Sequence, residues 1–295
     1  MSLVATLVCA PQSQVITSEV AHRAAAAAGA SAIDVLADGV AVDLRFDDSQ
    51  NRDELAPRLR APLAGLPVDV VIQSARTRRK KILIADMDST MIDQECIDEL
   101  ADEIGIRDQV AEITARSMNG EIAFEPALRE RVALLAGLRE SVVDRIVRDR
   151  IKLAAGAREL VATMNAAGAH TALVSGGFDV FTARIASMLG FNEHRANHLL
   201  AANGRFTGKV AEPILGRAAK AQALLEIARR AGVTPEDALA VGDGANDLDM
   251  IRLAGAGVAL HAKPVVAEQA EFRIDHGDLT ALLYIQGYRR DEFAT

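Results

Sequence analysis

Two aspartates stand two residues apart, directly after a short apolar segment. The segment is Ile82-Leu83-Ile84-Ala85, and Asp86-Met87-Asp88-Ser89-Thr90 follows it. A wholly apolar run of this length is typical of a strand that is buried on both faces of a parallel sheet. Ligands bind outside the carboxyl ends of such strands, and paired carboxylates there suit a hard divalent cation such as Mg²⁺. The alternative is an acidic turn that merely ends a strand.

A second acidic turn follows another apolar segment. Ala238-Leu239-Ala240-Val241 runs into Gly242-Asp243-Gly244-Ala245-Asn246-Asp247. The glycines allow the backbone to turn sharply and to approach a ligand closely. Asp243 and Asp247 would present carboxylates from the same sheet edge as the first pair. Two acidic turns on strands of one core predict a shared metal site.

A third apolar segment, Ala172-Leu173-Val174, ends in Ser175-Gly176-Gly177. A hydroxyl followed by exposed backbone N–H groups makes an anion cradle, although Ser175 could equally be an ordinary helix N-cap. Lys220 lies on a helix predicted over residues 217–230. A lone helical lysine is usually a solvated surface group, but an anion held by such a cradle needs one cation that faces it.

The elements that position these residues form an α/β core. From residue 82 onward, strand-like segments at 171–174, 238–241 and 257–260 are each followed by a helix, which indicates a doubly wound, Rossmann-like parallel sheet. Four helical stretches at about 94–150 stand between the strand at 82–85 and the strand at 171–174. Their place predicts a helical cap over the carboxyl edge of the sheet. We assign residues 76–295 to this domain.

The first 75 residues form a small unit of their own. Strands are predicted at 3–10, 32–36, 40–46 and 67–73, and helices at 18–28 and 51–63. Asp38-Gly39 is a strong hairpin signal between the second and third strands. The order β-α-β-β-α-β is the ferredoxin-like arrangement. The basic stretch 76–81 that follows is interpreted as a solvated linker, in preference to a phosphate-attracting patch.

Composition limits the class of protein. The 295 residues are enough for two domains, and the formal net charge of −8 with a pI near 5.3 argues against nucleic acid or anionic membrane as the main partner. An anionic substrate would have to be attracted by local positive charge and metal. The two cysteines, Cys9 and Cys96, make no disulfide framework. The start lacks a basic region and no apolar run approaches ~20 residues, so we expect a cytoplasmic protein.

Four motifs, in their order along the chain, resemble those of the haloacid-dehalogenase-like phosphatase superfamily. The first is Asp-x-Asp-x-Thr after an apolar strand, the second a Ser or Thr at a strand end, the third a Lys and the fourth an acidic turn. The resemblance covers about residues 82–285. The matching residues are Asp86, Asp88, Thr90, Ser175, Lys220, Asp243 and Asp247.

Within this superfamily the chain looks like the phosphoserine phosphatases. The N-terminal unit looks like the ACT-related domain that many bacterial members carry. Besides the motif residues, the segments that carry the resemblance are Glu95 with 97–101, Met118-Asn119-Gly120, Phe124 with Leu128, Arg131 and Val132, residues 175–178 and residues 242–247.

The resemblance implies a mechanism with an aspartyl-phosphate intermediate. Asp86 would attack phosphorus, and Asp88 would protonate the departing oxygen and later deprotonate the attacking water. Mg²⁺ would be held by Asp86, Asp243 and the backbone carbonyl at Asp88, while Asp247 would orient ligands or waters around it. The phosphoryl oxygens would be held by Ser175, the Gly176 N–H and Lys220, with Asn246 close to them.

The resemblance also implies O-phosphoserine as substrate, in the last step of serine biosynthesis. Glu95 would bind the α-ammonium and Arg131 the α-carboxylate, for which a guanidinium fork is well suited. Met118 and Phe124 would line an apolar wall that excludes water under the cap. From the residues alone, Glu95 could be an exposed first-turn helix acid and Arg131 a surface helix residue beside Arg129.

Two other functions stay open at this stage. The chain could be a phosphatase of the same superfamily for another small phosphomonoester, such as phosphothreonine or a sugar phosphate. It could also be an amino-acid-sensing regulatory protein, in which the N-terminal unit binds the ligand. A homodimer through that unit is a further hypothesis.

Overall fold

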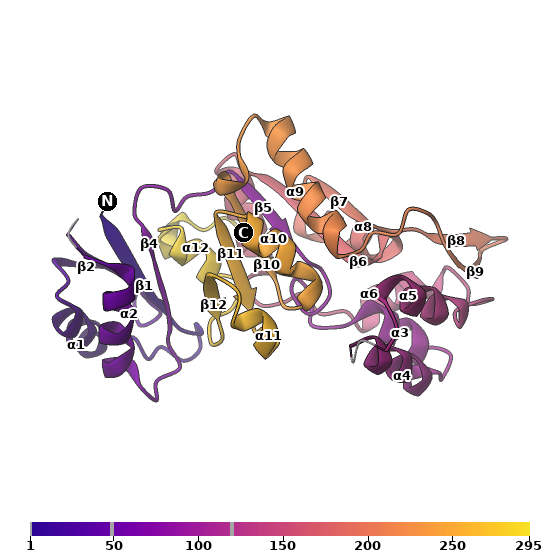
Figure 1. Ribbon diagram of the computed structural model, residues 1–295, viewed down its shortest axis with the longest axis horizontal. Coiled ribbons are helices and arrows are strands. Elements are labelled where there is room, and N and C mark those ends of the chain that lie inside the picture. Colours follow the sequence, from indigo (N-terminus) through magenta and orange to yellow (C-terminus); the bar gives the residue numbers. More distant parts are fainter. Residues whose placement is uncertain (1, 48–49, 119–120) are drawn as a thin grey trace.

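A parallel sheet of six strands lies at the centre of the part of the chain that the computed structural model describes, residues 2–47, 50–118 and 121–295 (Figure 1). Its order is β12-β11-β10-β5-β6-β7, and every neighbouring pair is parallel. The strands are β5 (Ile82–Ala85), β6 (His170–Phe178), β7 (Glu193–Asn197), β10 (Ala238–Gly242), β11 (Ala256–Leu260) and β12 (Phe272–Ile274). Because β10, β5 and β6 are adjacent, the three strands that carry the motifs end side by side.

Helices cover both faces of this sheet, as the predicted doubly wound fold requires. Ile82 and Ile84 face a layer that includes Leu224 of α9 (Arg217–Ala231) and Met250 of α10 (Leu248–Leu253). Leu83 and the alternate residues of the other strands pack on the opposite layer. That layer contains α7 (Ala157–Ala166), α8 (Asp179–Leu189) and α12 (Ala281–Ile285). The sequence did not predict β7 or β12, since β7 is a polar edge strand and β12 has only three residues.

A helical cap lies beyond the carboxyl edge of the sheet (Figure 1). Four helices form it within the range predicted, and they are α3 (Cys96–Asp102), α4 (Arg107–Met118), α5 (Phe124–Ala133) and α6 (Val142–Asp149). An antiparallel hairpin of β8 (Leu199–Ala202) and β9 (Arg205–Val210), which the sequence did not predict, packs against α5. At this contact a side chain at Gly208 would come within 3.1 Å of the Ala133 carbonyl. The cap therefore receives structure from two separate segments of the chain.

The N-terminal unit has the predicted β-α-β-β-α-β order. Its antiparallel sheet has the order β2-β3-β1-β4. Gly39, with φ of 70°, turns the hairpin between β2 and β3. Both helices pack on one face of this sheet. The elements are β1 (Leu3–Val8), α1 (Ser18–Ala28), β2 (Ala32–Ala37), β3 (Ala41–Arg45), α2 (Arg52–Arg60), continued by the 3₁₀ turn η1 (Ala61–Leu63), and β4 (Asp69–Ser74).

The other face of the N-terminal sheet packs against the core domain around α12. Val8, Val40 and Val71 belong to the same apolar cluster as Leu282. The Asp69 carboxylate accepts hydrogen bonds from the backbone N–H groups of residues 275–277, at 2.7 to 3.3 Å. The two units are thus joined by apolar and polar contacts, and the bounds 1–75 and 76–295 stay a prediction.

The basic stretch 76–81 is solvated only in part: residues 76, 77, 79 and 81 are exposed as a linker requires, but Arg78 is half-buried and Lys80 is buried. Arg78 donates a hydrogen bond from Nη1 to Asp43 Oδ2 at 2.6 Å, and Thr6 donates to the other oxygen at 2.7 Å. The guanidinium of Arg79 lies 3.9 Å from the ring centroid of Tyr288, and the Lys80 ammonium donates to the Glu236 carbonyl. A charge pattern in the sequence does not reveal such partners, because they come from distant segments.

No described helix combines the length and apolarity needed to cross a membrane.

Candidate active site

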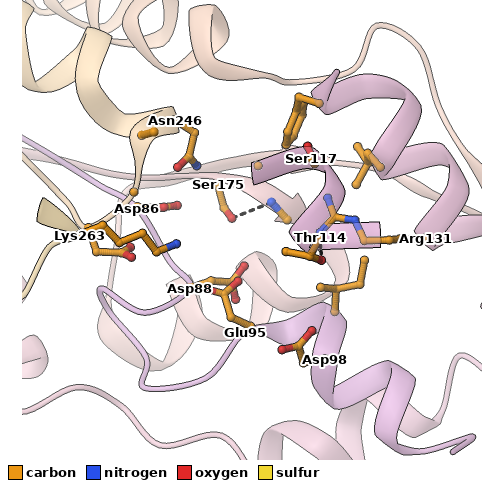
Figure 2. Close-up of a pocket in the computed structure, with 18 of the residues that line it drawn as sticks. Asp86, Asp88, Glu95, Asp98, Thr114, Ser117, Arg131, Ser175, Asn246 and Lys263 are labelled. Atoms are coloured by element: carbon orange, nitrogen blue, oxygen red, sulfur yellow. Dashed lines mark hydrogen bonds between the residues drawn. The ribbon is translucent and has the colours of Figure 1, made fainter. Parts of the chain in front are cut away.

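The turns after β5 and β10 and the Ser-Gly-Gly turn of β6 meet at one cavity of about 650 Å³ (Figure 2). Asp86, Asp88, Ser175 and Asp243 contribute from the sheet side. The cap contributes Glu95, Phe124, Leu128 and Arg131 from the opposite side. The sequence motifs are therefore brought together as predicted, between the sheet edge and the cap.

Asp86 lies at the floor of the cavity and is only 5% exposed. Its Oδ1 accepts the N–H of Met87 at 2.8 Å and lies 2.8 Å from the Lys220 ammonium. Burial and the neighbouring Asp247 carboxylate raise the pKa of Asp86 well above its usual range, against the opposing effect of Lys220. An anionic Asp86 thus depends on Lys220 and on any cation that binds beside it.

Lys220 is buried, so the alternative of a solvated surface lysine is wrong. The side chain is 1% exposed and reaches from α9 between two carboxylates. Its Nζ lies 2.8 Å from Asp86 Oδ1 and 2.7 Å from Asp247 Oδ1. These contacts raise the pKa of Lys220 despite the opposing effect of burial. A permanent positive charge is therefore fixed at the floor of the cavity.

Asp88 connects the sheet edge to the cap. Its Oδ1 accepts a hydrogen bond of 3.1 Å from the backbone N–H of Cys96. Cys96 is the first residue of α3. Gly177 lies so close that a Cβ there would stand 2.8 Å from Asp88 Oδ2. Burial and the nearby Glu95 raise the pKa of Asp88 to about 7. A carboxyl group with this pKa can both donate and accept a proton near neutral pH.

Asp243 and Asp247 complete an acidic cluster with Asp86. One carboxylate oxygen from each of the three lies within 4.8 Å of the other two. Thr90 donates from Oγ1 to Asp243 Oδ1 at 3.2 Å, and burial with the neighbouring Asp247 raises the pKa of Asp243 to about 6. Clustered carboxylates with raised pKa values fit a hard divalent cation, which prefers oxygen ligands and favours their ionised form.

Asp247 differs from its partners because both its oxygens already accept hydrogen bonds. Oδ1 accepts from Lys220, and Oδ2 accepts the N–H of Gly244 at 3.0 Å. Gly242 permits this packing, since a Cβ there would lie 2.3 Å from the Asp247 carboxyl carbon. The sequence assigned Asp247 an orienting role around the metal and assigned the third metal contact to the backbone at Asp88. The clustered oxygens add Asp247 as a further candidate ligand.

Ser175 is not a helix N-cap, which was the alternative interpretation. Strand β6 continues through the turn to Phe178, and Phe178 is the residue that precedes α8. The Ser175 hydroxyl accepts the N–H of Gly177 at 2.9 Å (Figure 2). Gly176 lies near Phe124 and Asn246, because a Cβ on it would be 3.6 and 3.9 Å from their side chains. Hydroxyl, glycine and amide therefore border the same space.

Asn197 supports this turn and was missed by sequence reasoning. The buried side chain donates from Nδ2 to the Gly176 carbonyl at 2.8 Å and to the Leu215 carbonyl at 3.2 Å. Its Oδ1 accepts the Leu215 N–H at 2.7 Å. An asparagine at the end of a polar strand carries no signal in a single sequence that would distinguish it from a surface residue.

Glu95 faces the cavity from the residue that precedes α3. Its Oε1 accepts the hydroxyl of Ser89 at 2.8 Å, and Ser89 has an uncommon positive φ of 55°. The alternative was an exposed acid in the first helical turn. Glu95 is exposed, as this alternative had it, but it precedes the helix and is held by the loop that carries the first motif, so its position is linked to that of Asp88.

Arg131 points into the cavity from α5, opposite Asp98 and Glu95 (Figure 2). Its Nε donates to the Ala127 carbonyl at 3.2 Å and its Nη1 to Thr114 Oγ1 at 3.3 Å. Burial lowers the pKa of Arg131 somewhat from its very high usual value. The alternative of a surface residue fits Arg129 instead, which is exposed and paired with Glu212.

The apolar wall is described in part. Phe124 and Leu128 line the cavity. Met118 is the last residue of α4, but its side chain, together with Asn119 and Gly120, lies outside the described part of the chain. Lining residues to which the sequence analysis gave no role are Asp98, Thr114, Ser117, Lys263 and Val265.

Fold and site together define a hydrolase that binds a phosphoryl group and a cation between a Rossmann-like sheet and a helical cap. Residues 80–255 match the haloacid dehalogenase-like hydrolase family. The chain belongs to this family.

Several proteins similar to this chain are phosphoserine phosphatases. One from Archaeoglobus fulgidus is 46% identical over 231 residues, which are 78% of this chain and 67% of that protein. The crystal structure of a probable phosphoserine phosphatase from Vibrio cholerae is 31% identical, with a TM-score of 0.79 over 97% of this chain and 86% of that one. A phospho-aspartyl intermediate analogue of phosphoserine phosphatase is 39% identical, with a TM-score of 0.65 over 70% of this chain and 98% of that one.

Proposed function

We propose that this chain is a Mg²⁺-dependent phosphatase that hydrolyses O-phosphoserine to serine and phosphate, the last step of serine biosynthesis. The observation that carries the proposal is the position of Asp86. It lies in a cluster with Asp243 and Asp247, is held by Lys220, and faces a cavity closed by Glu95 and Arg131. Relatives over most of the chain are phosphoserine phosphatases.

Asp86 is the nucleophile in this proposal. Phosphate monoesters resist anionic attack, so the site must neutralise charge and hold the attacking oxygen in line. Lys220 fixes the Asp86 carboxylate through Oδ1, which leaves its other oxygen for phosphorus. The bond between phosphorus and the serine oxygen breaks as the bond from phosphorus to Asp86 forms, and the departing oxygen takes a proton from Asp88, which gives an aspartyl phosphate and serine. Mg²⁺ held by Asp86, Asp243 and the backbone at Asp88 would supply the charge that lets carboxylate and phosphate approach.

Asp88 moves the protons. With a pKa near 7, the carboxyl group can give its proton to the departing serine oxygen and then accept one from the water that hydrolyses the aspartyl phosphate. The hydrogen bond from Cys96 N–H to Oδ1 leaves Oδ2 for this exchange. Because Cys96 begins α3, closure of the cap and placement of the acid are mechanically connected. Asp247 orients ligands or waters at the metal through its fixed carboxylate.

The remaining residues bind the substrate at its two ends. Ser175, the Gly176 N–H and Asn246 border the phosphoryl position, and Lys220 neutralises it from below. Arg131 binds the α-carboxylate and Glu95 the α-ammonium of phosphoserine. Phe124 and Met118 complete an apolar wall that keeps water from the intermediate. The two cap charges have opposite sign, as the two charges of an amino acid require.

The test is phosphate release from O-phosphoserine by the full chain, with Mg²⁺ and with a chelator. We expect wild-type activity that needs the metal, and a loss of at least about 10³-fold in Asp86→Asn. Asp93→Asn removes an exposed carboxylate from the same loop and is the matched control. Acid quenching with ³²P-labelled substrate should trap labelled protein in the wild type and in Asp93→Asn, but not in Asp86→Asn. Full activity of Asp86→Asn, or no phosphate release by the wild type, contradicts the proposal.

Assembly and location complete the proposal. A homodimer through the N-terminal unit would use the edge strand β2, where Val35 is 49% exposed. Light scattering measures the molar mass in solution. If the dimer forms through β2, the wild type should have the mass of two chains and Val35→Asp the mass of one. We place the protein in the cytoplasm, where thiols stay reduced, in keeping with the buried free cysteines Cys9 and Cys96.

A further inference from the structure

Lys263 brings a positive charge to the cavity that none of the motifs accounts for. It lies on the loop between β11 and the short helix α11 (Pro264–Ala267) and lines the cavity beside the acidic cluster. Figure 2 shows its side chain extending from the sheet side of the cavity toward Asp86 and Asp88. Among the described residues, no carboxylate oxygen lies within 4.0 Å of its ammonium group.

The backbone of Lys263 is held firmly although its side chain is unpaired. Its N–H donates to the carbonyl of Asp243 at 3.2 Å, which ties it to the acidic turn. Two residues earlier, the His261 N–H donates to the Ile274 carbonyl at 2.8 Å and its ring Nε2 lies 2.8 Å from the Gly277 carbonyl. Pro264 then restricts the next φ angle. The side chain of Lys263 therefore starts from a fixed backbone position at the mouth of the cavity.

The other cations of the cavity already have partners. Lys220 is bound by Asp86 and Asp247, and Arg131 hydrogen-bonds within the cap. Lys263 is thus the cation of the described sheet-side wall whose charge is available to an incoming anion. A dianionic phosphate must enter past the carboxylates of Asp88 and Glu95 in a protein of net charge −8. A positive charge at the entrance therefore raises the rate and the affinity with which the phosphate binds.

We propose that Lys263 is a second phosphate-binding cation, which captures the phosphoryl group at the mouth of the cavity and contacts one of its non-bridging oxygens in the bound state. This inference rests on the proposed function and deepens it. Lys220 positions the nucleophile from below, and Lys263 binds the phosphoryl oxygens from the solvent side. The contact concerns the phosphoryl group and not the amino-acid part, so it serves every phosphomonoester that enters.

Three variants of the full-length protein test this role. Lys263→Gln removes the charge, Lys263→Arg keeps it, and Lys81→Gln removes an equal charge at the amino end of β5, where the side chain is 64% exposed. Calorimetric titration of the Mg²⁺-loaded proteins with inorganic phosphate gives the dissociation constant. Initial rates with O-phosphoserine and with p-nitrophenyl phosphate, at ionic strengths from low to high, give kcat and KM.

We expect Lys263→Gln to weaken phosphate binding about tenfold, to raise KM for both substrates by a similar factor and to flatten the dependence of kcat/KM on ionic strength. Lys263→Arg should restore most of the binding, and Lys81→Gln should behave as the wild type. Two results would overturn the inference. One is unchanged phosphate affinity in Lys263→Gln at saturating Mg²⁺, including the case in which only Mg²⁺ affinity falls. The other is a loss confined to O-phosphoserine, which would place the contact on the amino-acid part.

The proposed function and this inference can fail separately. A wild-type protein that binds phosphate but releases none from O-phosphoserine contradicts the proposed substrate, while the phosphate titrations still decide the role of Lys263. Conversely, if the wild type is active and the Lys263 variants do not differ from it, only the role of Lys263 as a second phosphate-binding cation is contradicted.

Discussion

The ammonium of Lys220 lies between Asp86 and Asp247, 2.8 Å from one carboxylate and 2.7 Å from the other. All three side chains are buried, so each carboxylate depends on this charge while no metal is bound. In the proposed mechanism, a permanent cation from α9 and a metal ion from solvent would lie on two sides of the nucleophile Asp86. Binding of the metal and folding of the site are therefore energetically linked.

Lys220→Met should show this dependence. It leaves two buried carboxylates without their cation, which we expect to lower the free energy of unfolding of the metal-free protein by about 3 to 5 kcal/mol. Denaturant titration with and without Mg²⁺ measures the effect, and Mg²⁺ should recover part of the loss. Lys209→Met, which replaces an exposed lysine on β9, is the control. Equal stability of Lys220→Met and this control would show that the carboxylates do not need Lys220.

Asp88→Asn should separate proton transfer from phosphoryl transfer. The asparagine Oδ1 can still accept the Cys96 N–H, so the start of α3 is retained. We expect kcat with O-phosphoserine to fall by about 10² to 10⁴, because the alkoxide leaves without a proton. The rate of phosphoenzyme formation from p-nitrophenyl phosphate, measured by rapid quench, should fall much less, since phenolate is a good leaving group. Equal losses for both substrates would exclude Asp88 as the general acid.

Substrates that lack one charged group should distinguish the role of Arg131 from the role of Glu95. Arg131→Ala should reduce kcat/KM about a hundredfold for O-phosphoserine but little for phosphoethanolamine, which lacks the carboxylate. Glu95→Gln should instead have little effect with 3-hydroxypropanoate 3-phosphate, which lacks the ammonium. Arg129→Ala, two residues away on the same helix and exposed, is the matched control. A uniform loss across the three substrates in either cap variant would contradict its assigned contact.

The acidic cluster should make the metal-free protein less stable as the pH rises. The pKa of Asp243 is about 6 in the folded protein against an ordinary value of 3.8, so the folded state holds a proton that the unfolded state releases. This contribution is complete below about pH 4 and is lost as the pH passes 6, with an upper limit of about 3 kcal/mol. Thermal unfolding from pH 4 to 8 should show a smaller decline in Asp243→Asn. Asp93→Asn, the exposed control, should follow the wild type.

Mg²⁺ should reverse this trend, because the metal stabilises the ionised carboxylates of the folded protein. With Mg²⁺ present, the melting temperature should rise between pH 5 and 7. If the stability of the metal-free protein increases from pH 5 to 7 as strongly as that of the Mg²⁺-loaded protein, the pKa of Asp243 in the folded protein is not raised above its ordinary value.

The sequence predicts the elements that have strong local signals. Ile82–Ala85 and Ala238–Val241 are apolar throughout, and the acidic turns that follow them lie together because parallel strands end at one sheet edge. Elements without such a signal were missed. Strand β7 is polar, and the hairpin of β8 and β9 is recognised only by its packing on α5.

The same reason explains which site residues could be predicted. Lys220 has no distinguishing neighbours in sequence, and its place on the helix gained meaning only through the family resemblance. Asn197 and Lys263 act through contacts with Gly176 and Asp243, which lie 21 and 20 residues away in sequence. Pairings over such separations depend on the topology of the sheet, and a single sequence does not contain them in readable form. Arg78 is a further case, since its partner Asp43 belongs to the other unit.

Arg78 should be a determinant of how the N-terminal unit attaches to the core domain. Its side chain is 15% exposed and contacts Asp43, whose side chain is fully buried. Arg78→Met would leave that carboxylate with only the Thr6 hydroxyl, so we expect the free energy of unfolding to fall by about 3 kcal/mol or more at neutral pH. Burial already raises the pKa of Asp43, and loss of Arg78 raises it further. The protonated group is tolerated better, so the loss should be smaller at pH 5 than at pH 8.

Denaturant titration of Arg78→Met at the two pH values measures this difference. Arg76→Met, an exposed arginine of the same stretch, is the control and should change stability by less than about 0.5 kcal/mol. Adding Asp43→Asn to Arg78→Met should recover stability, because a neutral amide carries no unpaired charge and still accepts the Thr6 hydroxyl. If the double variant is less stable than Arg78→Met alone, the buried charge is not the cause of the loss. If all three variants match the wild type, Arg78 does not hold the two units together, and the contacts of Asp69 and α12 must do so.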